Sequence, residues 1–156
     1  MEQKLSTNVS RTIQTKLVLP PDTNHMGTIF GGKILALIDE IAAIAAIKHS
    51  KTAVVTASID KVNFRSSVKL GDILTIEGFV ISTGRTSMEV YVKVECEHID
   101  TGERRLTTDS FITMVAIDGD NRPTAVPGVI PETDEERELY KQAQERRALR
   151  QSGRKS

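Results

Sequence analysis

The spacing of apolar residues changes along the chain, and these changes predict where a helix and several strands lie. Residues 32–48 are rich in Ile, Leu and Ala, and the segment is too long for a strand, so we expect the principal helix there. Before it, the shared parity of apolar positions in residues 11–19 indicates a strand with one covered face. After the helix the period becomes two, and strands are predicted over residues 53–64, 73–82, 86–99 and 104–117.

Short turns that contain glycine separate the later strands, at residues 69–72, 82–85 and 100–103. Turns of this length predict that the last three strands form an antiparallel meander. One strand, one long helix and four further strands make an α+β plan, in which a sheet curls around a single helix. Because the helix is apolar on most sides and one sheet covers only one of them, we expect a homo-oligomer in which a second subunit completes its burial.

The residues after the last strand differ in composition from the rest. Residues 119–131 include three prolines and predict an irregular linker. Residues 132–156 are dominated by charged side chains, with acidic residues first and basic residues last, an order that suits a helix dipole. Since this segment carries few apolar positions, we expect a solvated helix followed by a tail.

Charge and cysteine content narrow the function classes. Lys and Arg together number 21, as do Asp and Glu, which gives no electrostatic reason for nucleic acid or an anionic membrane as partner. The N-terminus lacks an apolar run with a cleavage site, and the longest apolar stretch, residues 34–47, is short of a membrane span, so we expect a cytoplasmic protein. The lone Cys96 can make no internal disulfide and cannot form a zinc cluster by itself.

Asp39 is the acidic residue that stands out in the predicted helix. At about 100° per residue it falls on a side of small residues, Gly32, Ala36, Ala42, Ala43 and Ala46, away from the apolar ridge. A carboxylate in this place either pairs with a cation or a hydroxyl across an interface, or is partly desolvated and acts as a base or nucleophile. Helix position alone slightly favours the pairing role.

Three residues near Asp39 give weaker signals. The amides at the Gly31 helix start suit an oxyanion, although a glycine pair before a helix is more often a turn. Asn24 taken alone fits an Asx turn, and Thr56 is simply a good strand residue.

Taken together, these residues resemble the hotdog acyl-CoA thioesterases of the bacterial cytosolic and brain acyl-CoA hydrolase type. The stretches that carry the resemblance are residues 22–32, Asp39, residues 54–56, Phe64-Arg65, residues 68–72 and residues 84–87. The resemblance implies an α+β hotdog domain over residues 1–118, a linker over residues 119–131 and a charged C-terminal helical extension over residues 132–156. In a hotdog fold a five-stranded antiparallel sheet wraps one long central helix, and two units pair into a continuous sheet with the active sites at their interface. Many members are trimers of dimers, so the resemblance implies a homohexamer that hydrolyses acyl-CoA without metal or cofactor.

The resemblance also implies roles for single residues. Asp39 is the general base or nucleophile, assisted by Thr56. Asn24 from the facing subunit positions water or the thioester, and the Gly31 amide polarises the thioester carbonyl. The residues expected to bind the phosphates of CoA are Arg65, Ser66, Arg85, Thr86 and Ser87.

Two other functions stay open on the sequence alone. A non-catalytic acyl-CoA sensor would bind ligand in the same groove without turnover, but no helix-turn-helix or other output domain is recognisable. A hotdog dehydratase acting on hydroxyacyl thioesters would need a histidine in the site, and His25 is the one that lies near the candidate residues in the sequence.

Overall fold

A computed structural model describes residues 3–154, with side chains as far as residue 150. Its elements, in chain order, are β1 (Lys4–Ser6), α1 (Thr7–Ser10), β2 (Thr12–Leu17), the 3-10 helix η1 (Pro20–Asp22), α2 (Gly31–Ser50), β3 (Ala53–Phe64), β4 (Ile73–Thr83), β5 (Ser87–Glu97), β6 (Arg104–Ile117), β7 (Gly128–Ile130) and α3 (Asp134–Arg154). The predicted central helix and the five strands around it agree with these bounds to within two residues.

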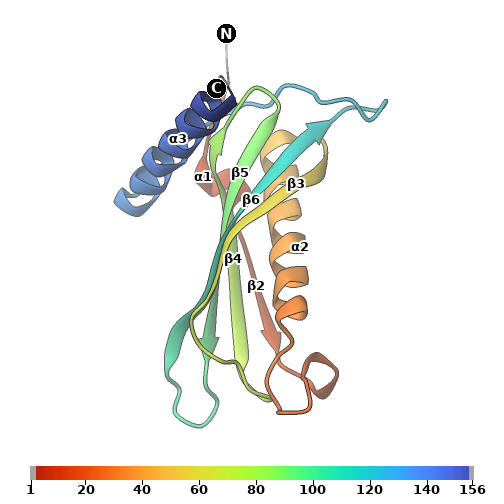
Figure 1. The fold of residues 1–156 in the computed structure, drawn as a ribbon, viewed down its shortest axis with the longest axis vertical. Coiled ribbons are helices and arrows are strands. Elements are labelled where there is room, and N and C mark those ends of the chain that lie inside the picture. The colour runs from red at the N-terminus through yellow and green to blue at the C-terminus, as the bar shows by residue number, and fades with distance from the viewer. Residues whose placement is uncertain (1–2, 155–156) are drawn as a thin grey trace.

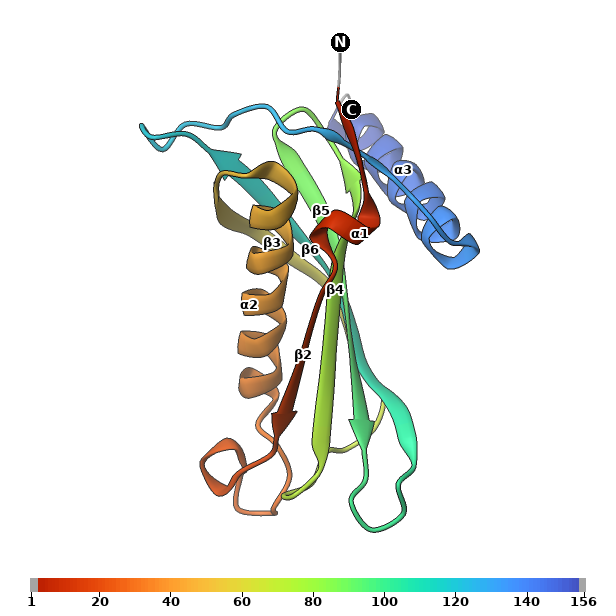
Figure 2. The ribbon, with the colours of Figure 1, turned by 180° about the vertical axis from the view of Figure 1, so that it is seen from behind.

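Strands β2, β4, β5, β6 and β3 form, in that order, one antiparallel sheet. The long helix α2 lies along one face of this sheet (Figures 1 and 2). Strands β4, β5 and β6 are consecutive neighbours, so the predicted meander is confirmed. The α+β plan of a five-stranded sheet around one long helix is confirmed as well.

Apolar side chains between α2 and the sheet make up the core. Ile38 and Ile41 of α2 have no exposed surface, and the strands supply residues such as Val92 and Met114 to the same buried cluster. Gly78 of β4 lets the helix come close, because a Cβ atom there would lie 2.7 Å from Cγ2 of Ile41. Any larger residue at this position would push α2 away from the sheet.

The side of α2 that faces away from the sheet is open. Ala36, Glu40 and Ile47 are exposed there. The single chain therefore covers only part of an apolar helix, which is the situation that led us to expect a second subunit.

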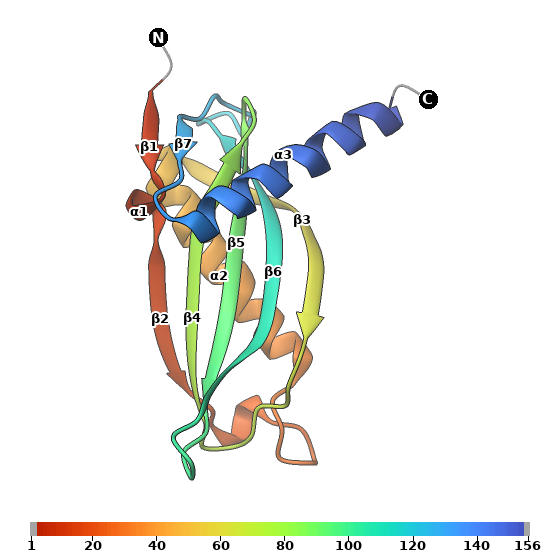
Figure 3. The same cartoon turned by 90° about the vertical axis from the view of Figure 1, so that its left-hand side faces the viewer.

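The N-terminus and the predicted linker form a small second sheet. Strand β1 pairs in parallel with β7, with Leu5 opposite Val129 (Figure 3). The expectation of an irregular segment over residues 119–131 is therefore wrong at its end, where Val129 is buried in the main core. Three residues are too short a run for a strand pattern to be recognised before its partner is known.

Helix α3 lies across the sheet face opposite α2 (Figure 3). Ala143 is buried in a second cluster with Phe79, Ile81 and Tyr91. The expectation of a solvated helix is wrong for this side of α3. Its apolar stripe is narrow, but ion pairs supplement it.

Ion pairs join the first turn and the middle of α3 to the rest of the chain. Glu136 accepts hydrogen bonds from Thr7 and Arg11, and Arg146 pairs with Glu89 of β5. Burial opposes ionisation of Glu136, but the bonds from Thr7, the Glu132 amide and Arg11 outweigh it and lower its pKa. Within residues 3–154 no helix has the length and apolar character needed to cross a membrane.

Candidate active site

A carboxylate and a hydroxyl meet on the open side of the molecule. Asp39 is near the middle of α2, and Thr56 is on β3, an outer strand of the sheet. The Thr56 hydroxyl donates to Asp39 Oδ1 over 2.7 Å and lies 3.5 Å from the sulfur of Met114. Asp39 is half-buried and Thr56 is exposed. The expected hydroxyl partner of Asp39 is present, but it belongs to the same chain and not to a facing one.

The small residues expected beside Asp39 do not form one open surface. Ala42 and Ala46 are fully buried against the sheet, whereas Gly32 and Ala36 are exposed. Asp39 therefore lies on the boundary between the buried and the open side of α2.

The start of α2 carries the predicted oxyanion donor. The amides of Lys33 and Ile34 donate to the carbonyl of Phe30, while the amides of the first helical residues have no intrahelical acceptor. A hollow of about 220 Å³ lies beside this helix start. It is lined by Thr28, Ile29, Gly31, Ile34, Phe64, Ser66, Ser67 and Val68. The Gly31 position is thus next to a cavity into which a carbonyl oxygen fits.

The Asn24 side chain is bound within its own loop. Its carbonyl oxygen accepts the amides of Met26 and Thr28 over 2.9 and 3.2 Å, and its amide group donates to the Thr28 hydroxyl over 3.0 Å. This is the Asx turn that the sequence alone favours. The loop also bonds outward, because the Leu70 amide donates to the carbonyl of Gly27.

Asp22 fixes the beginning of the same loop. It is buried, and its pKa is lowered by the hydrogen bond from the Leu19 amide, against the opposing effect of burial. Ion pairs with Lys16 at 3.1 Å and Lys33 at 3.5 Å lower it further. Residues 22–28, which we call the Asn24 loop, are therefore held to both β2 and the start of α2.

The residues expected to bind CoA fall into two groups at opposite ends of the sheet. Arg65 pairs with Asp109 at 3.3 Å, and Ser66 lines the hollow beside Gly31. At the other end, a pocket of about 440 Å³ is lined by Gly84, Arg85, Ser87, Glu89, Thr113, Arg147 and Arg150. Thr86 lies in this turn and accepts the Ala116 amide through its carbonyl.

The distance between the two groups follows from the strand register. Phe64 pairs with Thr108 near the start of β6, and Ser87 pairs with Val115 near its end. Seven residues of extended chain span about 24 Å. The sequence does not predict that Arg147 and Arg150 of α3 line this pocket. The basic composition of the end of the last helix is the one pattern that points to them.

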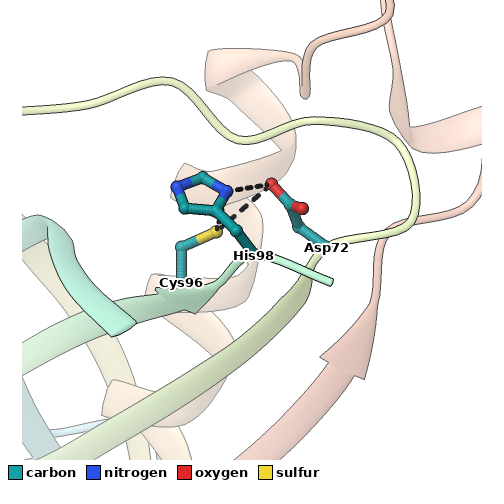
Figure 4. A group of neighbouring side chains, drawn as sticks. All are labelled: Asp72, Cys96 and His98. Atoms are coloured by element: carbon teal, nitrogen blue, oxygen red, sulfur yellow. Dashed lines mark hydrogen bonds and ion pairs between the residues drawn. The ribbon is translucent and has the colours of Figure 1, made fainter. Parts of the chain in front are cut away.

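A second polar cluster, also missed, lies at one end of the sheet, where Asp72 and Cys96 are buried and His98 is partly exposed (Figure 4). Asp72 Oδ2 accepts the Lys69 amide over 2.9 Å and lies 3.0 Å from His98 Nδ1 and 3.4 Å from Cys96 Sγ. Burial and the neighbouring Asp72 raise the pKa of the Cys96 thiol to about 12. Burial opposes ionisation of Asp72, but the bonds from Lys69, Cys96 and His98 outweigh it and lower its pKa. The available signal was the Cys-x-His spacing, which places both side chains on one face of a strand.

Comparison with known proteins assigns the family. Residues 26–103 match the model of the thioesterase superfamily, and this segment contains the helix with Asp39 and the strand with Thr56. A Bacillus subtilis (strain 168) protein described as an uncharacterised acyl-CoA thioester hydrolase, YkhA, is 45% identical over 88% of this chain and 80% of its own length. The chain belongs to the hotdog-fold acyl-CoA thioesterases.

Solved structures of the same thioesterase family superpose over nearly the whole chain. An apo-hexameric acyl-CoA thioesterase is 61% identical, with a TM-score of 0.92 over 96% of both chains. An acyl-CoA hydrolase from Staphylococcus aureus, solved with butyryl coenzyme A, coenzyme A and coenzyme A disulfide, is 42% identical, with a TM-score of 0.89 over 96% of this chain and 92% of that one. The Staphylococcus aureus enzyme is also solved as variants with alanine in place of one asparagine, one aspartate or one threonine.

Proposed function

We propose that this protein hydrolyses acyl-CoA to a free carboxylic acid and CoA, with Asp39 as the general base or nucleophile. The observation that carries the proposal is the Asp39–Thr56 pair, a half-buried carboxylate beside an exposed hydroxyl at an open sheet edge. The alanine variants of the Staphylococcus aureus hydrolase support it. Their asparagine, aspartate and threonine are 15 and 17 residues apart, as are Asn24, Asp39 and Thr56 here.

The arrangement suits a two-stage displacement at the thioester carbonyl. Because the Thr56 hydroxyl holds Oδ1, Oδ2 of Asp39 is left to take a proton from water. The water oxygen attacks the carbonyl carbon, and the Gly31 amide donates to the oxyanion that forms. The carbon–sulfur bond then breaks, and the CoA thiolate leaves with the electron pair and takes up the proton. In the nucleophilic variant Oδ2 attacks directly, and water hydrolyses the resulting anhydride.

Asp39 and Gly31 of one chain cannot act on the same carbonyl. Eight residues of helix separate them, which is about 12 Å along the axis. The edge of β3 is unpaired within residues 3–154, and Val55, Ile59 and Phe64 are exposed along the strand. Such an edge favours pairing with another strand.

Pairing of β3 with β3 of a second copy would complete the site. A twofold axis makes the two strands antiparallel, so the Thr56 end of one meets the Phe64 end of the other. Phe64 lies within 4 Å of the position of a Cβ on Gly31. Asp39 of one subunit would then work with Gly31, Asn24 and Ser66 of its partner.

Mixed dimers test this shared site. Asp39→Asn and Asn24→Ala subunits, each inactive alone, should recover about a quarter of the wild-type rate when mixed at random, because half of the dimers carry one intact site out of two. If both residues act within one chain, mixing restores nothing.

The same pairing would bring the two CoA-binding groups of facing subunits toward one another. We propose that Arg85, Thr86 and Ser87 bind the phosphates of CoA together with Arg147 and Arg150 of α3, and that Arg65 and Ser66 of the partner bind nearer the thioester. Following the hexameric relative, we propose a trimer of dimers in the cytosol, with acyl-CoA as substrate and no resident metal or cofactor in the reaction.

Release of free thiol from a panel running from acetyl-CoA to palmitoyl-CoA tests the proposed activity. Turnover of at least one member supports hydrolysis, and the panel also gives the chain-length preference. Saturable binding without thiol release would favour the sensor function instead. Loss of water from a hydroxyacyl-CoA would favour the dehydratase.

A further inference from the structure

The cluster of Asp72, Cys96 and His98, of which His98 is partly exposed, combines three kinds of metal ligand. Asp72 is in the turn before β4, while Cys96 and His98 are at the end of β5 and point the same way (Figure 4). One ligand atom from each residue lies within 4.8 Å of the other two. Asp72 and Cys96 are almost fully buried, so the positions of these atoms are fixed by packing.

The separations between the three atoms are close to those around a tetrahedral zinc ion. With zinc bonds of about 2.3 Å to sulfur and about 2.0–2.1 Å to nitrogen and oxygen, neighbouring ligand atoms are roughly 3.3–3.6 Å apart. The observed separations are 3.4 Å between sulfur and oxygen, 3.0 Å between nitrogen and oxygen and 4.0 Å between sulfur and nitrogen. A shift of about half an ångström in each side chain would close the site around the ion.

We propose that Asp72 Oδ2, Cys96 Sγ and His98 Nδ1 form a zinc site that nothing in the thioesterase reaction requires. Zinc is favoured over magnesium or calcium, because a thiolate is a soft ligand. Binding releases the thiol proton to solvent, and the neutral imidazole keeps its proton on Nε2. The ion, one carboxylate and one thiolate then sum to zero charge, which a buried site needs.

A cavity beside the cluster has room for the fourth ligand. Asp72 and His98 line a cavity of about 320 Å³, together with Lys69, Leu70, Ile99, Asp100, Thr101, Glu103 and Arg105. Water from this cavity supplies the fourth ligand.

The zinc would brace the loops that carry the start of the active site. The Asp72 carbonyl accepts the Val18 amide, and Leu70 in the same turn donates to Gly27 of the Asn24 loop. A metal bridge from this turn to β5 would therefore connect β5 with both the end of β2 and the Asn24 loop, which the turn already holds. Its role is structural, so its loss should lower stability more than it lowers turnover.

Cobalt titration of the untagged, chelator-treated chain tests the site. Cobalt(II) should bind once per chain and give a sulfur-to-cobalt charge-transfer band, which zinc then removes. Cys96→Ser should abolish the band, and His98→Ala should weaken binding by more than about a hundredfold, since even a lost second-shell partner costs 10–100-fold. His25→Ala, which removes an exposed histidine elsewhere, should leave the titration unchanged.

Thermal melting supplies a second readout that does not depend on activity. At about a hundredfold excess over its Kd, zinc should raise the Tm of the wild type by about 5–10 °C and leave that of Cys96→Ser unchanged. A cobalt spectrum without a thiolate band, or one that survives Cys96→Ser, overturns the proposal. In that case the three residues form only a hydrogen-bonded cluster, and the thiol-release assay stands or falls separately.

Discussion

Two aspartates of this chain are held in opposite ways. Asp72 is buried and accepts from a backbone amide, a histidine and a thiol, while half-buried Asp39 receives the hydrogen bond of Thr56 at the boundary of the open side of α2. The three bonds to Asp72 all converge on Oδ2, and its side chain is almost fully buried, so a substrate has little access to it. Asp39 has one oxygen fixed by Thr56 and a side chain that is only half-buried, so it is oriented and still within reach of a substrate. We therefore expect Asp72 to contribute to the stability of the fold and Asp39 to contribute to catalysis.

The largest effect should come from Asp39→Asn. The amide keeps the size of the side chain and can still accept from Thr56, but it neither takes a proton nor attacks a carbonyl. We expect kcat for thiol release to fall by at least about a hundredfold, within the range of general base catalysis, with little change in Tm.

The matched control for Asp39→Asn is Glu40→Gln, which removes the neighbouring, exposed carboxylate of the same helix. Glu40→Gln should retain the wild-type rate. Equal rates for Asp39→Asn and Glu40→Gln would contradict the assignment of chemistry to Asp39.

Asp72→Asn should show the reverse pattern. With metal removed by chelator, loss of the charged acceptor should reduce the free energy of unfolding by about 2 kcal/mol, as for other charge-assisted hydrogen bonds. The measurement is chemical or thermal unfolding at fixed protein concentration, alongside thiol release at a temperature where the variant stays folded. A stable variant that is inactive would reverse the roles of the two aspartates.

Thr56→Val sharpens the assignment by removing only the hydroxyl that orients Asp39. We expect kcat to fall about tenfold, equal to roughly 1.4 kcal/mol of barrier, with KM unchanged. Thr56→Ser should restore most of the rate because it keeps the donor. If Val and Ser behave alike, the hydrogen bond to Asp39 does not matter for turnover.

His49 provides a smaller, pH-dependent test of what burial does to a polar group. Burial lowers its pKa from the usual 6.5, against the opposing hydrogen bond between Nε2 and the Pro127 carbonyl. The unfolded chain binds a proton at His49 more readily than the folded chain does. The contribution of neutral His49 to the free energy of unfolding is therefore fully present above about pH 6.5 and is lost as the pH drops below it. The slope can reach at most about 1.4 kcal/mol per pH unit for each chain.

Unfolding measured between pH 8 and pH 5 checks this, with His49→Gln as the comparison. Glutamine keeps a donor for Pro127 and does not titrate, so the slope below about pH 6.5 should flatten. An identical slope in both proteins would assign the effect to another group.

The order and type of the main elements follow from the sequence, because the spacing of apolar residues within each element shows which of its faces is buried. The helix with Ile38 and Ile41 and the strands around it are visible as changes in period. The motif residues from Asn24 to Thr56 carry the family as well, since chemistry of this kind needs particular residue types at particular separations. The sequence also indicates that so apolar a helix needs more cover than one sheet provides.

Only the tertiary structure decided which side chains touch. It placed Thr56 on Asp39 and separated Arg65 from Arg85. It also joined Asp72 to Cys96 and His98, residues more than twenty positions apart whose individual patterns are ordinary. Periodicity records which face of an element is buried, whereas a contact depends on how two elements are registered against each other, and that is determined by packing over the whole chain.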